Sequence, residues 1–143
     1  GQNNRIFKMP KYRTMRIDTP DIATHLMSNP KFYLSPLGGI LRSYSLDELP
    51  QLFSVLKGDM SFVGPRPALH NQDDLIALRS KKGINKLVPG ITGWAQVNGR
   101  DSISIQKKVI FEKYYIDNKS FFLDVKILVF TIIKVFFRTD VNH

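Results

Sequence analysis

Apolar residues recur at helical spacing along several segments of the chain. From Leu46 to Leu56 they recur every three or four residues, and Gly58 is a residue type that commonly follows a helix. The same criteria predict three further helices, over residues 71–82, 104–116 and 120–138. The first of these, with Asn71 as its cap, is expected to be exposed to solvent. Helices therefore dominate the predicted structure.

Short segments of strand or turn composition lie between the predicted helices. The composition of residues 5–15 predicts an extended basic strand, which Pro10 restricts to a sheet edge or a bend. Ser61–Val63 predicts another short strand, and residues 18–39 predict a loop with one helical turn near 21–28. We therefore expect a single α+β domain over residues 1–143, with a few short strands and amphipathic helices at a membrane interface.

The segment 120–138 is unusually rich in phenylalanine and aliphatic residues for one helix. Lys126, Lys134 and Arg138 supply most of its polar remainder, and Asp124 is its only acidic residue. This pattern favours a helix that lies in the membrane interface, with its apolar side in the lipid and its lysines at the headgroups. A central core helix is the alternative. The helix carries too many charges to span a bilayer.

The charge balance points to an anionic partner. The chain has 21 Lys and Arg residues against 12 Asp and Glu residues, a formal net charge of +9. Nucleic acid, acidic lipid and a phosphorylated substrate all fit this balance. The absence of cysteine excludes disulfides and thiolate metal sites.

Two adjacent carboxylates, Asp47 and Glu48, stand at the start of a predicted helix in this basic chain. One interpretation is structural, because Ser45 and Glu48 have the spacing of a capping box and Asp47 would favour the helix dipole. In the other, both carboxylates face a phosphate at the helix start. Asp47 would then attack phosphorus, and Glu48 would hold Mg²⁺, which prefers hard oxygen ligands.

Several basic and aromatic residues are candidate substrate contacts. Arg66 lies between two prolines, and an arginine on a rigid turn binds phosphate oxygens with little loss of entropy. Arg42 precedes the carboxylates by a few residues, and Lys11 lies in the predicted basic strand. The alternative for each of these three residues is a solvated surface charge without a role in binding.

The turn-rich segment from Pro89 to Arg100 contains the only tryptophan, Trp94. Its ring is suited to stack on a base. Gln96 is suited to hydrogen-bond the polar edge of a base, and Arg100 to bind a phosphate. The alternative is that Trp94 anchors the core and that the glycines only form turns.

Taken together, these segments resemble the bacterial sugar transferase family, the monotopic phosphoglycosyl transferases that act on polyprenyl phosphate. The resemblance follows the family's order over Lys11–Met15, Leu41–Arg42, Ser45–Leu52, Lys57–Pro67, Pro89–Arg100 and Tyr115–Val135. The motifs Ser-Leu-Asp-Glu-Leu-Pro-Gln-Leu, Gly-Asp-Met-Ser-Phe-Val-Gly-Pro-Arg-Pro and Pro-Gly-Ile-Thr-Gly-Trp-Ala-Gln-Val-Asn-Gly-Arg carry it.

The resemblance implies a two-step transfer of a sugar 1-phosphate. The aspartate that matches Asp47 attacks the β-phosphate of a UDP-sugar and releases UMP, and polyprenyl phosphate then attacks the covalent intermediate. Asp47 and Glu48 are expected to work with Mg²⁺, and Lys11, Arg42 and Arg66 match basic active-site residues. The family acts at the cytoplasmic face of the bacterial inner membrane, in the first membrane step of capsule, O-antigen, exopolysaccharide or glycoprotein glycan synthesis.

The chain departs from the family pattern in three places. Members carry an N-terminal hydrophobic segment that re-enters the membrane, and this chain is expected to begin after it. Lys31 lies where many members have the arginine of Asp-Pro-Arg, and Glu112 lies where many have aspartate. An inactive membrane-peripheral domain and a basic nucleic-acid-binding module are the alternative functions. The identity of the sugar and a homo-oligomeric state are left open.

Overall fold

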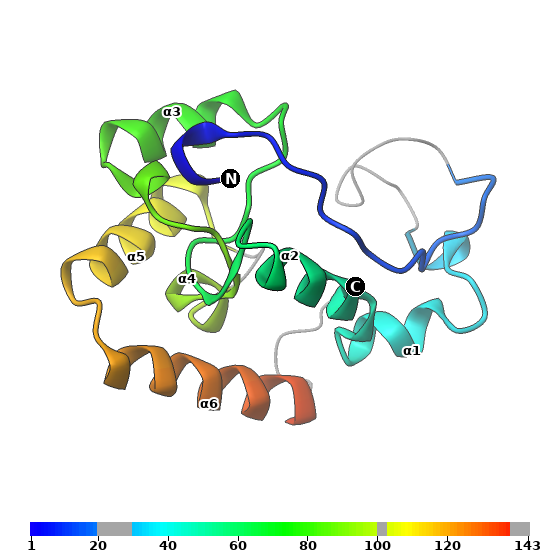
Figure 1. Cartoon of the computed structure of the whole chain (residues 1–143). Helices are drawn as coiled ribbons and strands as arrows, with labels where there is room; N and C mark the ends of the chain where they lie inside the picture. The colour runs from blue at the N-terminus through cyan, green and yellow to red at the C-terminus, as the bar shows by residue number, and fades with distance from the viewer. Residues whose placement is uncertain (20–29, 100–102, 138–143) are drawn as a thin grey trace.

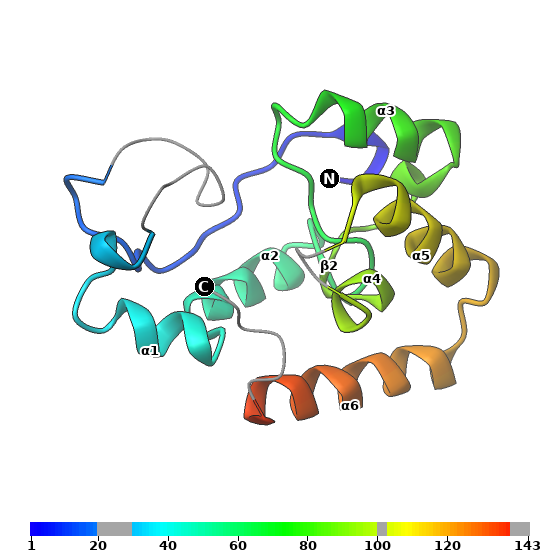
Figure 2. The same cartoon turned by 180° about the vertical axis from the view of Figure 1, so that it is seen from behind.

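The computed structural model describes residues 1–19, 30–99 and 103–137 (Figures 1 and 2). The α-helices are α1 (Gly38–Ser43), α2 (Leu52–Leu56), α3 (Asp73–Lys81), α4 (Trp94–Val97), α5 (Ile105–Asp117) and α6 (Phe121–Phe137). The 3₁₀ helices are η1 (Gln2–Asn4), η3 (Pro30–Tyr33), η4 (Leu46–Gln51) and η5 (Ile84–Lys86), and the strands are β1 (Ser61–Val63) and β2 (Gly90–Thr92). The predicted helix-dominated α+β fold is confirmed.

The two strands form a small parallel sheet near the middle of the molecule. Ser61 pairs with Gly90 and Val63 pairs with Thr92, and the connection between the strands carries α3 and η5, as parallel pairing requires. A side chain at Gly90 would bring its Cβ within 2.1 Å of the Gly64 nitrogen, so the close approach needs glycine. The sequence predicted β1 but only a turn-rich segment at β2.

The opening basic segment is not a strand. Within the described residues it has only an isolated bridge between Met15 and Leu34, and the Tyr12 amide donates to the Asp47 carbonyl at 2.9 Å. The segment runs extended along the surface (Figure 1), where no neighbouring strand completes a ladder. The helical turn that was predicted near residues 21–28 lies outside the described residues.

Helices α3 and α5 pack together around one of two buried apolar clusters, formed by Leu75, Ile84 and Val109. A buried ion pair between Arg79 and Glu112 joins the same two helices. The prediction of a solvent-exposed helix over residues 71–82 is therefore wrong for its inner face. Its cap position is Gln72 and not Asn71. In α5, by contrast, the predicted start holds, because the Ser104 hydroxyl accepts from the Lys107 amide.

The second cluster joins α4, α5 and α6 through Val97, Tyr115 and Ile127. The Tyr115 hydroxyl donates to an Asp124 carboxylate oxygen at 2.7 Å. Burial first, and this hydrogen bond second, raise the pKa of Tyr115 above its ordinary value. A neutral, bonded phenol thereby fixes the start of α6 against α5.

Helix α6 lies along one side of the molecule (Figures 1 and 2). Most of its apolar side chains are exposed. Ile127 is fully buried, whereas Phe122 is 83% exposed and Phe136 is 73% exposed. The alternative of a central core helix is therefore wrong, and the amphipathic pattern that was predicted for residues 120–138 is seen over 121–137. Among the described residues, no helix combines the length and apolar character needed to cross a bilayer.

Candidate active site

The adjacent carboxylates lie on η4, a short 3₁₀ helix that follows a strained residue. Ser45 adopts a left-handed conformation, with φ 53° and ψ 24°, and its side chain makes no capping hydrogen bond. Pro50 lies inside η4 and lacks the N–H that an α-helix would use at this point. The predicted capping box is therefore absent, and the Glu48 carboxylate is available for other partners.

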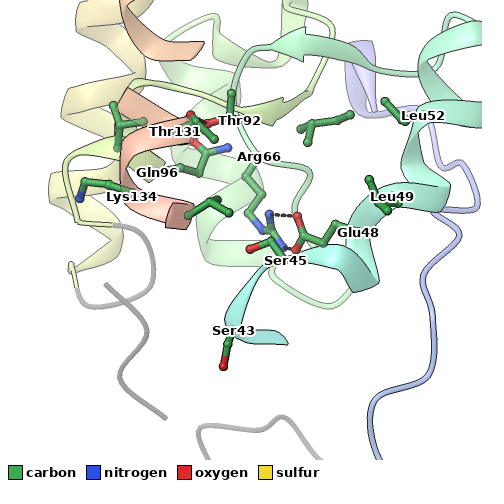
Figure 3. Close-up of a pocket in the computed structure, with 13 residues that line it drawn as sticks. Ser43, Ser45, Glu48, Leu49, Leu52, Arg66, Thr92, Gln96, Thr131 and Lys134 are labelled. Atoms are coloured by element: carbon green, nitrogen blue, oxygen red, sulfur yellow. Dashed lines mark hydrogen bonds and ion pairs between the residues drawn. The ribbon is translucent and has the colours of Figure 1, made fainter. Parts of the chain in front are cut away.

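Asp47 and Glu48 are both buried, at 3% and 7% exposed, and both meet cations from distant parts of the chain. Lys11 Nζ lies 2.9 Å from Asp47 Oδ2 and 3.6 Å from Glu48 Oε1. Arg66 forms a two-pronged pair with Glu48, Nη1 donating to Oε2 at 3.2 Å and Nη2 to Oε1 at 2.5 Å (Figure 3). The two carboxylates and two cations balance in charge, which makes their burial tolerable.

Arg42 has a different neighbour. Its Nε donates to Thr14 Oγ1 at 2.9 Å, and Thr14 is buried at 4% exposed. The bond ties α1 to the N-terminal segment that carries Lys11. A contact between Arg42 and phosphate stays a prediction.

A cavity of about 170 Å³ opens beside the carboxylate network, between η4, the β2–α4 region and α6. Glu48, Arg66 and Gln96 line it, together with Thr92 and Thr131 (Figure 3). Sequence reasoning missed Thr92, Thr131 and Lys134. In the sequence, Thr131 and Lys134 interrupt the apolar stretch of α6. Lys134 was assigned to the lipid headgroups, and Thr131 was given no role.

The remaining predicted contacts separate in space. The Trp94 ring stacks on Tyr114, with the centroids 5.5 Å apart, and Lys126 Nζ lies 5.6 Å from its centroid. Trp94 therefore packs between α5 and α6, as its core-anchor alternative predicted, and a role in substrate binding stays a prediction. Arg100 lies outside the described residues. The structure thus joins Lys11, Asp47, Glu48 and Arg66 in one network, and Gln96 lines the cavity beside it.

The carboxylate pair suits a magnesium ion whose ligands come partly from the protein and partly from water and substrate. Among the described residues there is no cluster of three or more Asp, Glu, His or Cys side chains that could hold a metal. Asp47 and Glu48 offer hard oxygen ligands, and Mg²⁺ commonly takes one or two carboxylates and fills its octahedron with water and substrate phosphates. The arrangement fits a phosphate-bridged ion better than a metal held by protein alone.

The family profile described as "Bacterial sugar transferase" matches residues 1–138. The chain belongs to the bacterial sugar transferase family. It is 46% identical over 137 residues to the uncharacterized sugar transferase EpsL of Bacillus subtilis, covering 94% of this chain and 65% of EpsL. The undecaprenyl-phosphate glucose phosphotransferase of Komagataeibacter xylinus is 37% identical over 98% of this chain and 28% of its own length.

The undecaprenyl-phosphate galactose phosphotransferase of Salmonella typhimurium is 33% identical, over 98% of this chain and 32% of its own length. The chain therefore spans less than two thirds of these curated relatives. The region they share with it contains the carboxylate pair and both cations described above.

Proposed function

We propose that this chain is the catalytic region of a phosphoglycosyl transferase that moves a sugar 1-phosphate from a UDP-sugar to polyprenyl phosphate. The observation that carries the proposal is the burial of Asp47 and Glu48 beside Lys11 and Arg66. Similarity to proteins named undecaprenyl-phosphate glucose and galactose phosphotransferases supports this assignment.

In the first step, an Asp47 carboxylate oxygen forms a bond to the β-phosphorus of the donor. The bond between that phosphorus and the bridging oxygen breaks, and UMP leaves with the electron pair. In the second step, a phosphate oxygen of the polyprenyl phosphate attacks the same phosphorus. The Asp47 carboxylate then leaves unchanged, and the product is a polyprenyl-diphosphate sugar.

Lys11 and Arg66 suit the charge changes of both steps. In the free protein, Lys11 neutralises Asp47 and Arg66 neutralises Glu48. An incoming diphosphate brings new oxygens to which both cations can bind, which frees carboxylate oxygens for reaction. The two-pronged guanidinium matches the oxygens of a phosphoryl group, whose transfer depends on positioning and charge neutralisation.

Asp47 and Glu48 are the residues that we propose to hold Mg²⁺ together with the donor's diphosphate. A bound magnesium ion supplies neutralisation of phosphate charge and orients the phosphoryl group. Arg66 already fixes both carboxylate oxygens of Glu48, at 3.2 and 2.5 Å. Glu48 therefore has a defined position beside Asp47.

The lipid surface of the inner membrane, at its cytoplasmic face, is the proposed location of the reaction. The acceptor carries a long hydrocarbon chain, and α6, which lines the cavity through Thr131, Lys134 and Val135, exposes Phe122, Val129 and Phe136. Leu49 and Leu52 line the cavity from the other side and are 50% and 40% exposed. An acceptor held in lipid can therefore approach the network along apolar surface.

The substitution Asp47→Asn tests the proposal. Lys11 is 40% exposed, so the solvent-screened pair with Asp47 contributes about 1 kcal/mol or less and the variant should fold. With UDP-sugar, Mg²⁺ and polyprenyl phosphate in detergent, UMP release should fall by about 10⁴-fold or more, as follows the loss of a covalent nucleophile.

The covalent phosphosugar adduct of the unsubstituted protein, detected by intact mass spectrometry, should be absent from the variant. Asp117→Asn, on the exposed end of α5, is the matched control and should keep both signals. Undiminished turnover by Asp47→Asn would remove the nucleophile assignment. No UMP release from the unsubstituted protein with any UDP-sugar would favour the inactive membrane-peripheral alternative.

A further inference from the structure

The cavity beside Arg66 contains an amide without hydrogen-bond partners. Gln96 on α4 lines the cavity, and neither polar atom of its side chain has a partner among the described residues, although both are shielded from solvent. A buried amide in this condition costs free energy, and buried polar groups are normally paired. A bound molecule with hydroxyl groups would supply both missing partners.

Two hydroxyls add a second polar feature to the same wall. Thr131 Oγ1 donates to the Ile127 carbonyl at 2.8 Å within α6, and lies 2.7 Å from Thr92 Oγ1. Because a hydroxyl has one proton, Thr92 must be the donor in their shared bond. Both oxygens therefore retain acceptor capacity, while the Gln96 amide offers a donor and an acceptor.

Much of the remaining cavity lining is apolar. Leu49, Leu52, Ile91 and Val135 contribute to it. A group that presents hydroxyls at its rim and C–H bonds on its faces matches this combination. At about 170 Å³ the cavity is similar to a cavity of about 150 Å³ that binds benzene, so it accommodates one six-membered ring.

The position of the cavity distinguishes between the rings of the donor. Glu48 and Arg66, which we propose to bind the donor's diphosphate, line it directly, so its occupant lies beside that diphosphate. In a UDP-sugar, the sugar is attached to the β-phosphate itself, whereas uracil is separated from it by the ribose and the α-phosphate. We propose that this cavity holds the pyranose ring of the donor, and that Gln96, Thr92 and Thr131 bind its hydroxyls. The assignment rests on the proposed function.

This assignment gives α6 a second role. One face of the helix exposes apolar side chains, and the other supplies Thr131 and Lys134 to the cavity wall (Figure 3). The residues that contact the sugar thus include part of the same helix that contacts lipid.

Gln96→Leu and Thr131→Val test the sugar subsite, with Gln106→Leu on the exposed face of α5 as the matched control. Initial rates of UMP release are measured for UDP-glucose, UDP-galactose and an N-acetylated UDP-sugar. We expect kcat/KM to fall about 10- to 100-fold for the preferred donor, with a changed ratio between sugars, because a site built to bind hydroxyls discriminates through them. The KM for polyprenyl phosphate should not change.

Inhibition by UMP, which carries no sugar, separates the donor's two rings. Each variant should keep the UMP inhibition constant of the unsubstituted protein. Weaker UMP inhibition with an unchanged sugar ratio would assign the cavity to uridine, and an effect on the KM for polyprenyl phosphate alone would assign it to the acceptor. Either result overturns the proposal.

The transferase function and the sugar subsite are refuted by different results. Absence of UMP release by the unsubstituted protein would refute the transferase function, whereas normal activity of both variants toward every sugar would refute only the sugar subsite. Thr131→Val removes one hydroxyl at nearly constant volume, so it keeps the test decisive if Gln96→Leu does not fold.

Discussion

The buried pair between Arg79 and Glu112 provides a measurable test of how α3 is held against α5. Their side chains are 8% and 2% exposed, and Arg79 Nε donates to Glu112 Oε2 at 2.8 Å while Nη2 donates to the other carboxylate oxygen. Removing either partner leaves a charge in the interior without its counter-ion. Such single changes destabilise proteins by roughly 3–5 kcal/mol.

Arg79→Met and Glu112→Leu are the single changes, and their combination completes a double-mutant cycle. Leu75 and Val109 are apolar neighbours of the pair, one turn away on the same helices, so the two new side chains meet compatible surroundings. An apolar pair of similar volume is often neutral or stabilising. The two single losses would sum to roughly 6–10 kcal/mol. The double variant should lose much less than this, so the coupling should be at least about 3 kcal/mol, the upper end of the usual range.

Urea unfolding followed by circular dichroism measures the four free energies of unfolding. The exposed pair Lys113 and Asp117, 42% and 52% exposed, provides a control cycle whose coupling should be below about 0.5 kcal/mol. For a domain with roughly 5–15 kcal/mol of total stability, the single changes are large enough to measure. Additive losses in the Arg79–Glu112 cycle would show that the pair does not hold the two helices together.

Two further predictions concern the sheet and the membrane face. Gly90→Ala should lower the free energy of unfolding by roughly 1–3 kcal/mol, because its Cβ would lie 2.1 Å from the Gly64 nitrogen, whereas Gly39→Ala, with open space at its Cβ, should be neutral or slightly stabilising. Equal urea midpoints for the two variants would contradict the close strand approach. Phe122→Ser combined with Phe136→Ser should reduce flotation with phosphatidylglycerol vesicles several-fold, because these rings are 83% and 73% exposed on α6. Leu69→Ser, on a loop outside α6, is the control, and equal flotation of all proteins would remove the interfacial role of α6.

Local patterns predicted those parts of the fold whose cause is local. Ser104 starts α5 because its own hydroxyl accepts from the first turn, and Gly58 follows α2 in a left-handed conformation with φ 81°. The amphipathic character of α6 also follows from its own residues. The carboxylate pair and the rigid turn around Arg66 were identified from their composition and from the family resemblance.

Long-range pairing decided the features that these patterns missed. Residues 5–15 have strand-like composition, yet they form no strand because the fold gives them no strand partner. Gly90–Thr92 has turn-like composition, yet it pairs with Ser61–Val63 because glycine allows the two backbones to approach. The capping box at Ser45 was expected from local spacing, but it does not form. The Glu48 carboxylate instead forms ion pairs with Arg66 and Lys11, which are distant in the sequence.

The sequence by itself determined which chemical groups this protein has available: two neighbouring carboxylates, a guanidinium held between prolines, and a helix too apolar to be fully hydrated. Only the tertiary structure decided which of them meet. Lys11, Glu48 and Arg66 are separated along the chain but share one network, and Thr131 of α6 turns inward to Thr92 beside it. The physical reason is that a buried charge or hydroxyl needs a partner close to it in space. The spacing of two residues along the sequence does not give the distance between them in the folded chain.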